Sequence, residues 1–313
     1  MTIIRRTLLF LIPLAFPALA DTFGTGPSQF TIEFVEIGSP GNAGDPLGKP
    51  LYAGAVGYGY RMGTYEVSTS MMSIANSLGG LGLDYTGRSG NKPATDITWN
   101  EAARFVNWLN TSTGNAPAYK FTAQPGDPGY SANANISLWQ IGEAGYDAAN
   151  PFRNARARYF LPSSDEWYKA AYYKGGSKAA GYWLYPMQSN DSPGNIVGKG
   201  TNQANFWKGV FSVTQSADYP KQTSLSEVGA FTNSASAYGT YDQGGNVLEW
   251  NDAVIGEFSR GLRGGDWNGN ELGLQSPTRG DGGNGAPTYK DDDIGFRLAT
   301  LPQPSGGALL RRR

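Results

Sequence analysis

The chain has 313 residues, which is enough for one large domain or two small ones. Its formal net charge is −1 and no cluster of Lys and Arg occurs inside the domain, which argues against nucleic-acid binding. It contains neither cysteine nor histidine, so disulfides, thiolate chemistry and Ser-His-Asp triads are excluded.

The first twenty residues have the pattern of a secretory signal peptide. Arg5 and Arg6 supply positive charge, residues 8–18 are apolar but too short to span a bilayer, and Ala18-Leu19-Ala20 is a small-x-small cleavage site. The arginine pair also loosely matches a twin-arginine signal, but an apolar residue precedes it, so the general secretory route is favoured. We expect a secreted, periplasmic or cell-surface domain over residues 21–300, without a transmembrane span.

Strand and helix signals follow in the first hundred residues. Alternating apolar residues predict strands at Phe30–Ile37 and Tyr58–Val67. A helix is expected at Thr69–Leu78, ending at the glycine pair that follows it. High glycine content together with 13% aromatic residues indicates a loop-rich fold held by aromatic anchors.

The clearest helix starts after Thr98. Thr98 and Glu101 form a capping box, in which each side chain satisfies a free N–H at the helix start. Residues 111–158 are rich in Gly, Ala, Asn and Pro, and we expect long loops there. Ser163 and Glu166 form a second capping box and therefore predict another helix.

The last residues, 301–313, form a Pro- and Gly-containing tail that ends in three arginines. The tail is similar to a shortened bacterial surface-sorting signal, although the usual hydrophobic span is missing. A disordered basic tail is an equal alternative, so the sequence leaves anchoring open.

Six segments carry a set of motifs in a fixed order. They are Tyr65-Glu-Val67, Pro93 to Leu109, Leu161-Pro-Ser-Ser-Asp-Glu-Trp167, Gly239 to Trp250, Arg263-Gly-Gly-Asp-Trp267 and Ile294-Gly-Phe-Arg297. Together they resemble the sulfatase-modifying-factor family, which includes the formylglycine-generating enzymes. The resemblance covers roughly residues 30–299 and implies a single domain with the irregular, loop-rich α+β fold of C-type lectins.

The resemblance also implies a first structural calcium site. Asp242 and Glu249 would provide side chains, and Gly245 and Val247 would provide carbonyls. Carboxylates flanking a glycine turn with exposed carbonyls are suitable ligands for calcium. The alternative is a turn whose Glu249 is buried against an arginine.

A second calcium site is implied further upstream, with Asn205, Phe206, Asp218 and Pro220 as ligands, although its spacing differs from the family pattern by a small insertion. The alternative there is a loop anchored by Trp207. The tripeptide Trp250-Asn251-Asp252 is similar to one by which C-type lectins hold calcium and sugar, but their partner motif is absent.

The reactive residues of the family are missing. Asp266 stands where the enzymes have a catalytic serine, and their two copper-binding cysteines would fall near Gly269 and Leu274. Formylglycine-generating chemistry is therefore excluded. The iron-dependent sulfoxide-synthase branch uses histidine ligands, so it is excluded as well.

Carboxylate chemistry is not excluded. Asp266, Asp281 and Asp291–Asp293 could meet in one cleft, but we favour a solvated surface by roughly three to one. Arg297 is expected to support the core by pairing with a buried carboxylate such as Glu249.

The stretch between these motifs also resembles the ligand-binding face of retroelement-diversified variable proteins. The implied ligand contacts are Asp266, Trp267, Asn268, Asn270 and Tyr289. The leading hypothesis is a calcium-stabilised module that binds a glycan, peptide or protein at the cell envelope, or has a structural role there. The alternative is a cysteine-independent periplasmic oxidase or maturation enzyme of the same superfamily, with Asp266 as its catalytic group.

Overall fold

The computed structural model describes residues 19–86, 88, 90–219, 224–255, 259–280 and 285–302. Most of the expected export signal, the tail from residue 303, Asp281 and Pro220 lie outside these ranges. Leu19 and Ala20, which the sequence assigned to the export signal, are described and lie in the first strand.

The larger sheet has five antiparallel strands in the order β1-β2-β3-β8-β4. Their bounds are Leu19–Thr25 for β1, Ser28–Ile37 for β2, Tyr60–Gly63 for β3, Tyr159–Phe160 for β4 and Ala299–Thr300 for β8. Alternate residues of β2 are buried, as the sequence predicted. The expected strand at 58–67 is shorter, because after Gly63 the chain turns so that Glu66 enters the core.

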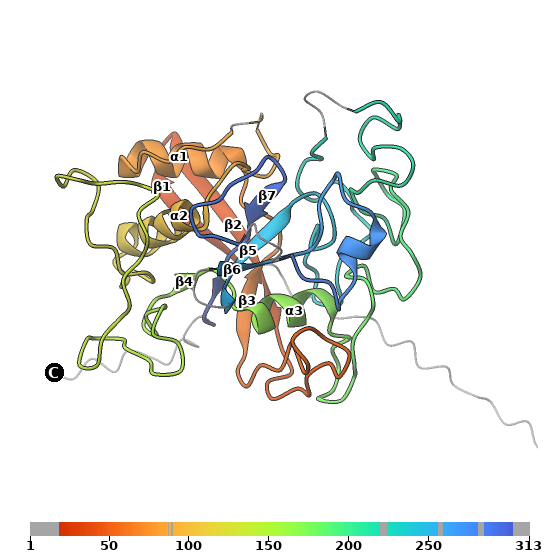
Figure 1. Cartoon of the computed structure of the whole chain (residues 1–313), viewed down its shortest axis with the longest axis horizontal. Coiled ribbons are helices and arrows are strands. Elements are labelled where there is room, and N and C mark those ends of the chain that lie inside the picture. The colour runs from red at the N-terminus through yellow and green to blue at the C-terminus, as the bar shows by residue number, and fades with distance from the viewer. Residues whose placement is uncertain are drawn as a thin grey trace, which may run out of the picture.

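Two helices pack on this sheet (Figure 1). They are α1, Thr69–Gly79, and α2, Trp99–Ser112. The capping box of Thr98 and Glu101 is present at the start of α2, which confirms the predicted signal. The helix α1 ends at Gly80, whose φ of 57° is the left-handed conformation that glycine adopts without strain.

A smaller sheet holds the C-terminal motifs. Its order is β6-β5-β7, with β5 at Leu248–Ile255, β6 at Ser259–Arg263 and β7 at Ile294–Phe296. β5 is antiparallel to β6 and parallel to β7. The third helix, α3 at Ser164–Tyr172, contacts β5 and has the second predicted capping box, and a 3₁₀ turn, η1, covers Glu271–Leu274.

The β5–β6 ladder contains a bulge. Asn251 pairs with Gly261, but the next pair is Val254 with Arg260, so Asp252 and Ala253 have no partner in β6. The bulge frees the carbonyl of Asp252, which accepts a hydrogen bond from Nη1 of Arg260 at 3.3 Å.

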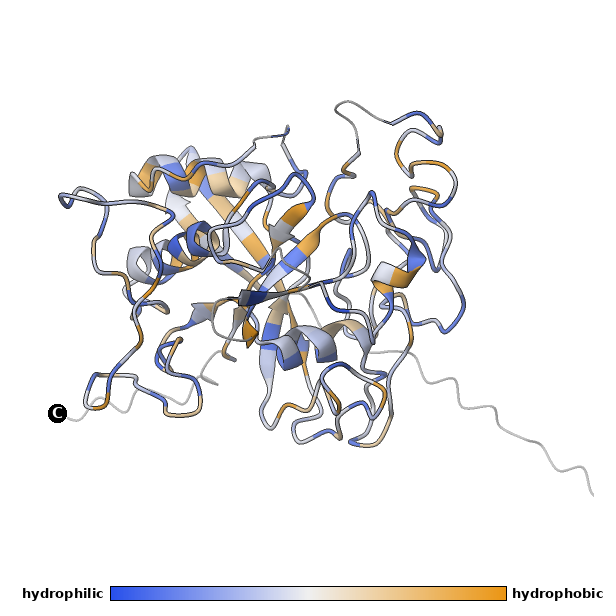
Figure 2. Cartoon of the chain, viewed as in Figure 1, coloured by the Kyte–Doolittle hydropathy of each residue, from blue (hydrophilic) through white to orange (hydrophobic). Residues whose placement is uncertain are grey.

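Long irregular segments surround the two sheets, as the sequence predicted for 111–158. Figure 2 shows apolar residues concentrated along the central strands, with more polar loops outside. Polar side chains fix these loops to the core: Asn107 both donates to the carbonyl of Tyr119 and accepts from its N–H. The predicted α+β, loop-rich fold is confirmed. No helix in the described part of the chain has the length and apolar character needed to cross a bilayer.

One buried ion pair connects the parts of this fold. Arg297, directly after β7, donates from Nε and Nη2 to both oxygens of Glu249 on β5, each at 2.6 Å. Both side chains are fully buried. Trp167 of α3 donates to the same carboxylate at 2.7 Å, and Arg297 also donates to the carbonyl of Gly63 in β3. The expected partner of Arg297 is therefore confirmed.

Removal of this arginine tests its structural role. We expect Arg297→Met to lower the free energy of unfolding by about 3–5 kcal/mol, because Glu249 would stay buried without its counter-charge. Urea unfolding followed by tryptophan fluorescence measures the loss. The control is Arg88→Met, which breaks the part-exposed pair of Arg88 with Asp292 and should cost about 0–1 kcal/mol. Equal losses in the two variants would contradict the central role of Arg297.

Candidate functional site

The loop after β6 places Asp266. Gly264 and Gly265 have φ values of 107° and 70°, and a Cβ on Gly265 would lie 2.9 Å from the backbone of Gly273, so the turn requires glycine there. Oδ1 of Asp266 accepts hydrogen bonds from the N–H groups of Asn268, at 2.8 Å, and Gly269, at 2.7 Å. One carboxylate oxygen therefore closes the loop and the side chain is held in place.

Asp266 shares its surroundings with Asp291, Asp292 and Asp293, and we call these four residues the acidic surface. Burial and the charges of Asp266, Asp291 and Asp292 raise the pKa of Asp293 to about 7. Burial raises the pKa of Asp266 as well, with smaller contributions from Asp292 and Asp291. The charges of these four described carboxylates therefore influence one another, while their meeting in one cleft stays a prediction and Asp281 lies outside the described residues.

Two residues that the sequence did not single out border the acidic surface. Arg88 forms an ion pair with Asp292 at 2.9 Å, and Tyr219 is 62% exposed. Burial first, and then the charges of Asp292 and Asp293, raise the pKa of Tyr219. Both residues come from loops far away in the sequence without a motif, so no local signal could have identified them.

The expected ligand contacts differ in exposure. Trp267 is only 2% exposed and packs against Phe211 and Tyr219, so its ring belongs to the core in this structure. Asn268 and Asn270 are exposed. Tyr289 is half-buried and donates to Asp291 at 2.7 Å, which connects it to the acidic surface.

The two positions expected for the copper-binding cysteines carry no reactive group. The carbonyl of Gly269 accepts from the N–H of Trp207 at 2.8 Å. Leu274 is fully buried and packs in a cluster with Tyr185 and Phe206. Neither position therefore carries a side chain that could bind copper or act as a nucleophile.

The first expected calcium set does not fit a cation in this arrangement. Both oxygens of Glu249 are taken by Arg297 and Trp167. Asp242 accepts from the N–H of Gly229 at 2.6 Å, and burial raises its pKa to about 6. Among the described residues, no three acidic side chains are grouped as metal ligands.

The second set is better suited to a cation. Asn205 is buried, and its Oδ1 has no hydrogen-bond partner, while its Nδ2 donates to Ser224 and Asn246 at 2.9 Å each. A calcium ion would satisfy this oxygen. The carbonyl of Phe206 accepts only a long bond of 3.3 Å from Asn195. Asp218 is exposed and Pro220 lies outside the described residues.

The lectin-like tripeptide Trp250-Asn251-Asp252 lies inside β5 and is buried. The carboxylate of Asp252 forms an ion pair with Arg153 at 3.3 Å. The indole of Trp250 donates to the carbonyl of Ile97 at 2.9 Å. In this structure the tripeptide contributes to the core and not to a sugar-binding surface.

Comparisons with known proteins agree with this architecture. The family profile described as the sulfatase-modifying factor enzyme 1-like domain matches residues 55–301. No curated protein sequence matches the chain. Among solved structures, the crystal structure of CarF is similar with 18% identity and a TM-score of 0.57, and the alignment covers 87% of this chain and 99% of CarF.

Two further structures share the fold. PvdO from Pseudomonas aeruginosa has 18% identity and a TM-score of 0.53, over 92% of this chain and 100% of PvdO. Variable protein 1 of Treponema denticola has 21% identity and a TM-score of 0.50, over 91% of this chain and 100% of that protein. At these identities the likeness concerns the fold alone.

The raised pKa of Asp293 gives a pH-dependent prediction. Its folded-state pKa of about 7 lies above the ordinary 3.8, so the folded protein holds this proton more tightly, and its contribution to stability is lost as pH rises from about 4 to 7. We expect Asp293→Asn to raise the melting temperature at pH 8 and to have little effect at pH 4. The control is Asp191→Asn, an exposed residue with the same charge change. An equal shift in both variants at pH 8 would contradict the crowding of the acidic surface.

Proposed function

This chain belongs to the family of the sulfatase-modifying factor enzyme 1-like domain, and we propose that it binds a ligand and does not generate formylglycine. The observation that carries the proposal is the replacement of the family's reactive residues by an acidic surface. The whole chain lacks cysteine, and the two expected cysteine positions are filled by a packed leucine and a glycine in a closed loop. No thiolate is available to reduce oxygen or to attack a substrate cysteine.

The charge of the acidic surface indicates the class of ligand. Burial, and then the charges of neighbouring carboxylates, raise the pKa of Asp293 and Asp266, and Arg88 is paired with Asp292. A positively charged group would relieve this repulsion. Among the glycan, peptide and protein ligands that the sequence left open, this favours a peptide or protein segment rich in Lys or Arg, with Asn268, Asn270 and Tyr289 as neighbouring polar contacts.

The proposed place of action is the cell envelope or the medium. It rests on the export pattern of residues 1–20 and on long polar loops carried by a rigid core. We propose calcium only at the second set of expected ligands. There Oδ1 of the buried Asn205 has no hydrogen-bond donor.

One observation favours an enzyme as the second candidate. A carboxyl group with a pKa near 7 beside a second carboxylate can act as a general acid or base at neutral pH. In that case the carboxyl group of Asp293 would donate a proton to the substrate or accept one from it, and Asp266 would be the neighbouring carboxylate. This alternative retains the cysteine-independent maturation enzyme that the sequence left open.

Binding of a lysine-rich peptide tests the leading proposal. We expect tetralysine to bind in a titration followed by NMR or calorimetry, and to bind roughly three- to tenfold more weakly to the double variant Asp291→Asn/Asp292→Asn. The affinity should fall with added salt. Asp191→Asn is the matched control and should bind like the wild type.

The same protein samples distinguish the two candidates. Under the binding proposal, neither the wild type nor Asp266→Ala consumes oxygen in an oxygen electrode. Oxygen consumption by the wild type that is lost in Asp266→Ala would establish the enzyme. Unchanged tetralysine affinity in the double variant would remove the acidic surface as the binding site.

Calcium binding is tested by thermal unfolding and elemental analysis. We expect the wild type to purify with calcium when no chelator is used, and to lose several degrees of melting temperature in EDTA, because an ion that binds only the folded state stabilises it. Asn205→Ala should be insensitive to calcium. Asn110→Ala, whose amide is fully paired in the core, should be less stable yet keep the calcium response. A calcium response in Asn205→Ala would contradict this site.

A further inference from the structure

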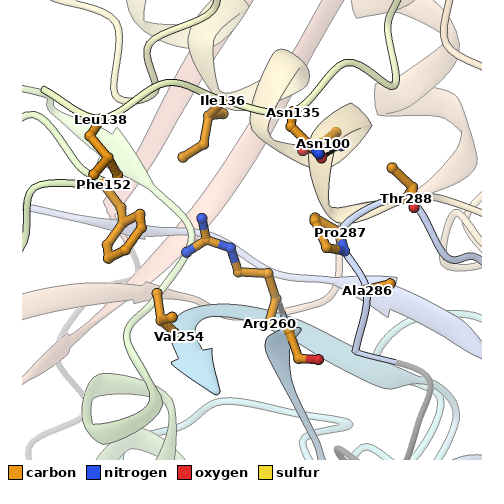
Figure 3. A pocket seen from close by; sticks show the side chains of 11 residues that line it. Asn100, Asn135, Ile136, Leu138, Phe152, Val254, Arg260, Ala286, Pro287 and Thr288 are labelled. Carbon is orange, nitrogen blue, oxygen red and sulfur yellow. Dashed lines mark hydrogen bonds between the residues drawn. The ribbon is translucent and has the colours of Figure 1, made fainter. Parts of the chain in front are cut away.

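A pocket lies where β5 ends and β6 begins (Figure 3). β5 starts beside Asp293, whose carbonyl accepts from the N–H of Leu248, and it ends at Ile255, which pairs with Ser259 at the start of β6. Arg260 stands at this second end, and we call the cavity the Arg260 pocket. Its volume is about 330 Å³, within the range of small-molecule sites.

The cation of this pocket is buried, and the charge of Asp252 acts to raise its pKa. Arg260 is 7% exposed, and among the described residues no carboxylate forms an ion pair with it. The nearby Asp252 carboxylate forms its ion pair with Arg153 instead. Of the five N–H groups of the guanidinium, one donates to a protein oxygen, the carbonyl of Asp252, at 3.3 Å.

Aromatic rings hold the guanidinium without using its hydrogen-bond donors. The Cζ atom of Arg260 lies 4.1 Å from the ring centre of Trp99 and 4.7 Å from that of Phe152. Figure 3 shows the guanidinium pointing into the space between Phe152, Val254 and Ile136. Burial lowers the pKa of Arg260, and the charge of Asp252 offsets part of this effect; a bound anion would favour the charged form further.

A second unsatisfied group lines the same pocket. Asn100 is fully buried, and its Nδ2 donates to the oxygens of Asn133 and Asn135, the latter at 2.9 Å. These bonds fix the orientation of the amide, and its Oδ1 is left buried without a donor. A bound group with an O–H or N–H could supply that donor.

The remaining walls are largely apolar. Ile136, Leu138, Phe152 and Val254 line the pocket, and Leu138 and Val254 are 42% and 41% exposed at its edge. One cation balances one negative charge, which suits a carboxylate better than a phosphate with about two charges. We propose that the Arg260 pocket binds a small carboxylic acid with an apolar chain and an α-hydroxyl or α-amino group, its carboxylate on Arg260.

This site differs from the acidic surface in charge and in its lining residues, although Thr288 of the pocket directly precedes Tyr289, which donates to Asp291. A positively charged peptide has no partner in the Arg260 pocket, and a carboxylate is repelled from the acidic surface. Either proposal can therefore fail while the other stands.

The test uses three probes of the same shape: isocaproate, its α-hydroxy form leucic acid, and the neutral isocaproamide. We expect millimolar binding of both acids in a titration followed by NMR, tighter for leucic acid, and no binding of the amide. Arg260→Gln should weaken the binding of both acids roughly 10- to 100-fold, because a charge-assisted hydrogen bond is lost. Asp191→Asn, at an exposed residue outside both sites, is the control and should bind both acids like the wild type.

A second variant keeps the test decisive if Arg260→Gln does not fold. Val254→Tyr leaves Arg260 in place and fills the pocket from its exposed edge, so both acids should again lose binding. Equal binding of isocaproamide and isocaproate, absence of acid binding to the wild type, or unchanged binding in Val254→Tyr would overturn the proposal. Equal affinities of leucic acid and isocaproate would contradict the part assigned to Asn100.

Discussion

The buried contact between Arg297 and Glu249 is the interaction on which the rest of this structure depends. It joins β5 to the residue after β7, reaches β3 through the carbonyl of Gly63, and binds α3 through the indole of Trp167. Two sheets and a helix therefore meet at one charged group. Because few regular elements support the surrounding loops, this contact sets the relative position of the segments that carry the acidic surface and the Arg260 pocket.

The core around Arg297 and Glu249 contains more acidic than basic side chains. Glu66 and Asp242 lie near Glu249, and the charge of Arg297 acts to lower the pKa of both, against the effect of burial. Burial, then the charges of Asp242 and Glu249, raise the pKa of Glu66 well above its usual range. Glu66 contacts Nδ2 of Asn246 at 3.0 Å, and Asn246 accepts from Asn205. A continuous polar network thus runs from the core to the oxygen where we propose calcium.

Much of this fold could be predicted because its signals are local. The capping boxes at Thr98 and Ser163 and the alternation in β2 each depend on a few neighbouring residues, and the Arg297–Glu249 pair was expected from motif order. β1 was missed because Leu19 and Ala20 also fit an export signal. The burial of Trp267 depends on Phe211 and Tyr219 from a distant loop, and a sequence pattern does not record such packing.

The two proposed sites also depend on contacts between distant segments, which the sequence alone could not predict. Asp266 was identified by its place in a motif, but the contribution of Arg88 depends on the folding of a loop almost two hundred residues earlier. The Arg260 pocket draws its lining from α2, from the loop at 135–138, from β5 and β6, and from 286–288. No single segment of the sequence contains enough of that pocket to predict it.

The bulge in β5 has a consequence for how this sequence can change in length. Two residues, Asp252 and Ala253, are inserted between consecutive pairs with β6, so Val254 faces the same side of the sheet as an unbulged strand would place it. An even number of inserted residues preserves the alternation of inward and outward side chains, and an odd number reverses it. Deleting Asp252 and Ala253 together would therefore close the ladder without moving Val254 to the other face, but it would remove the carbonyl to which Arg260 donates.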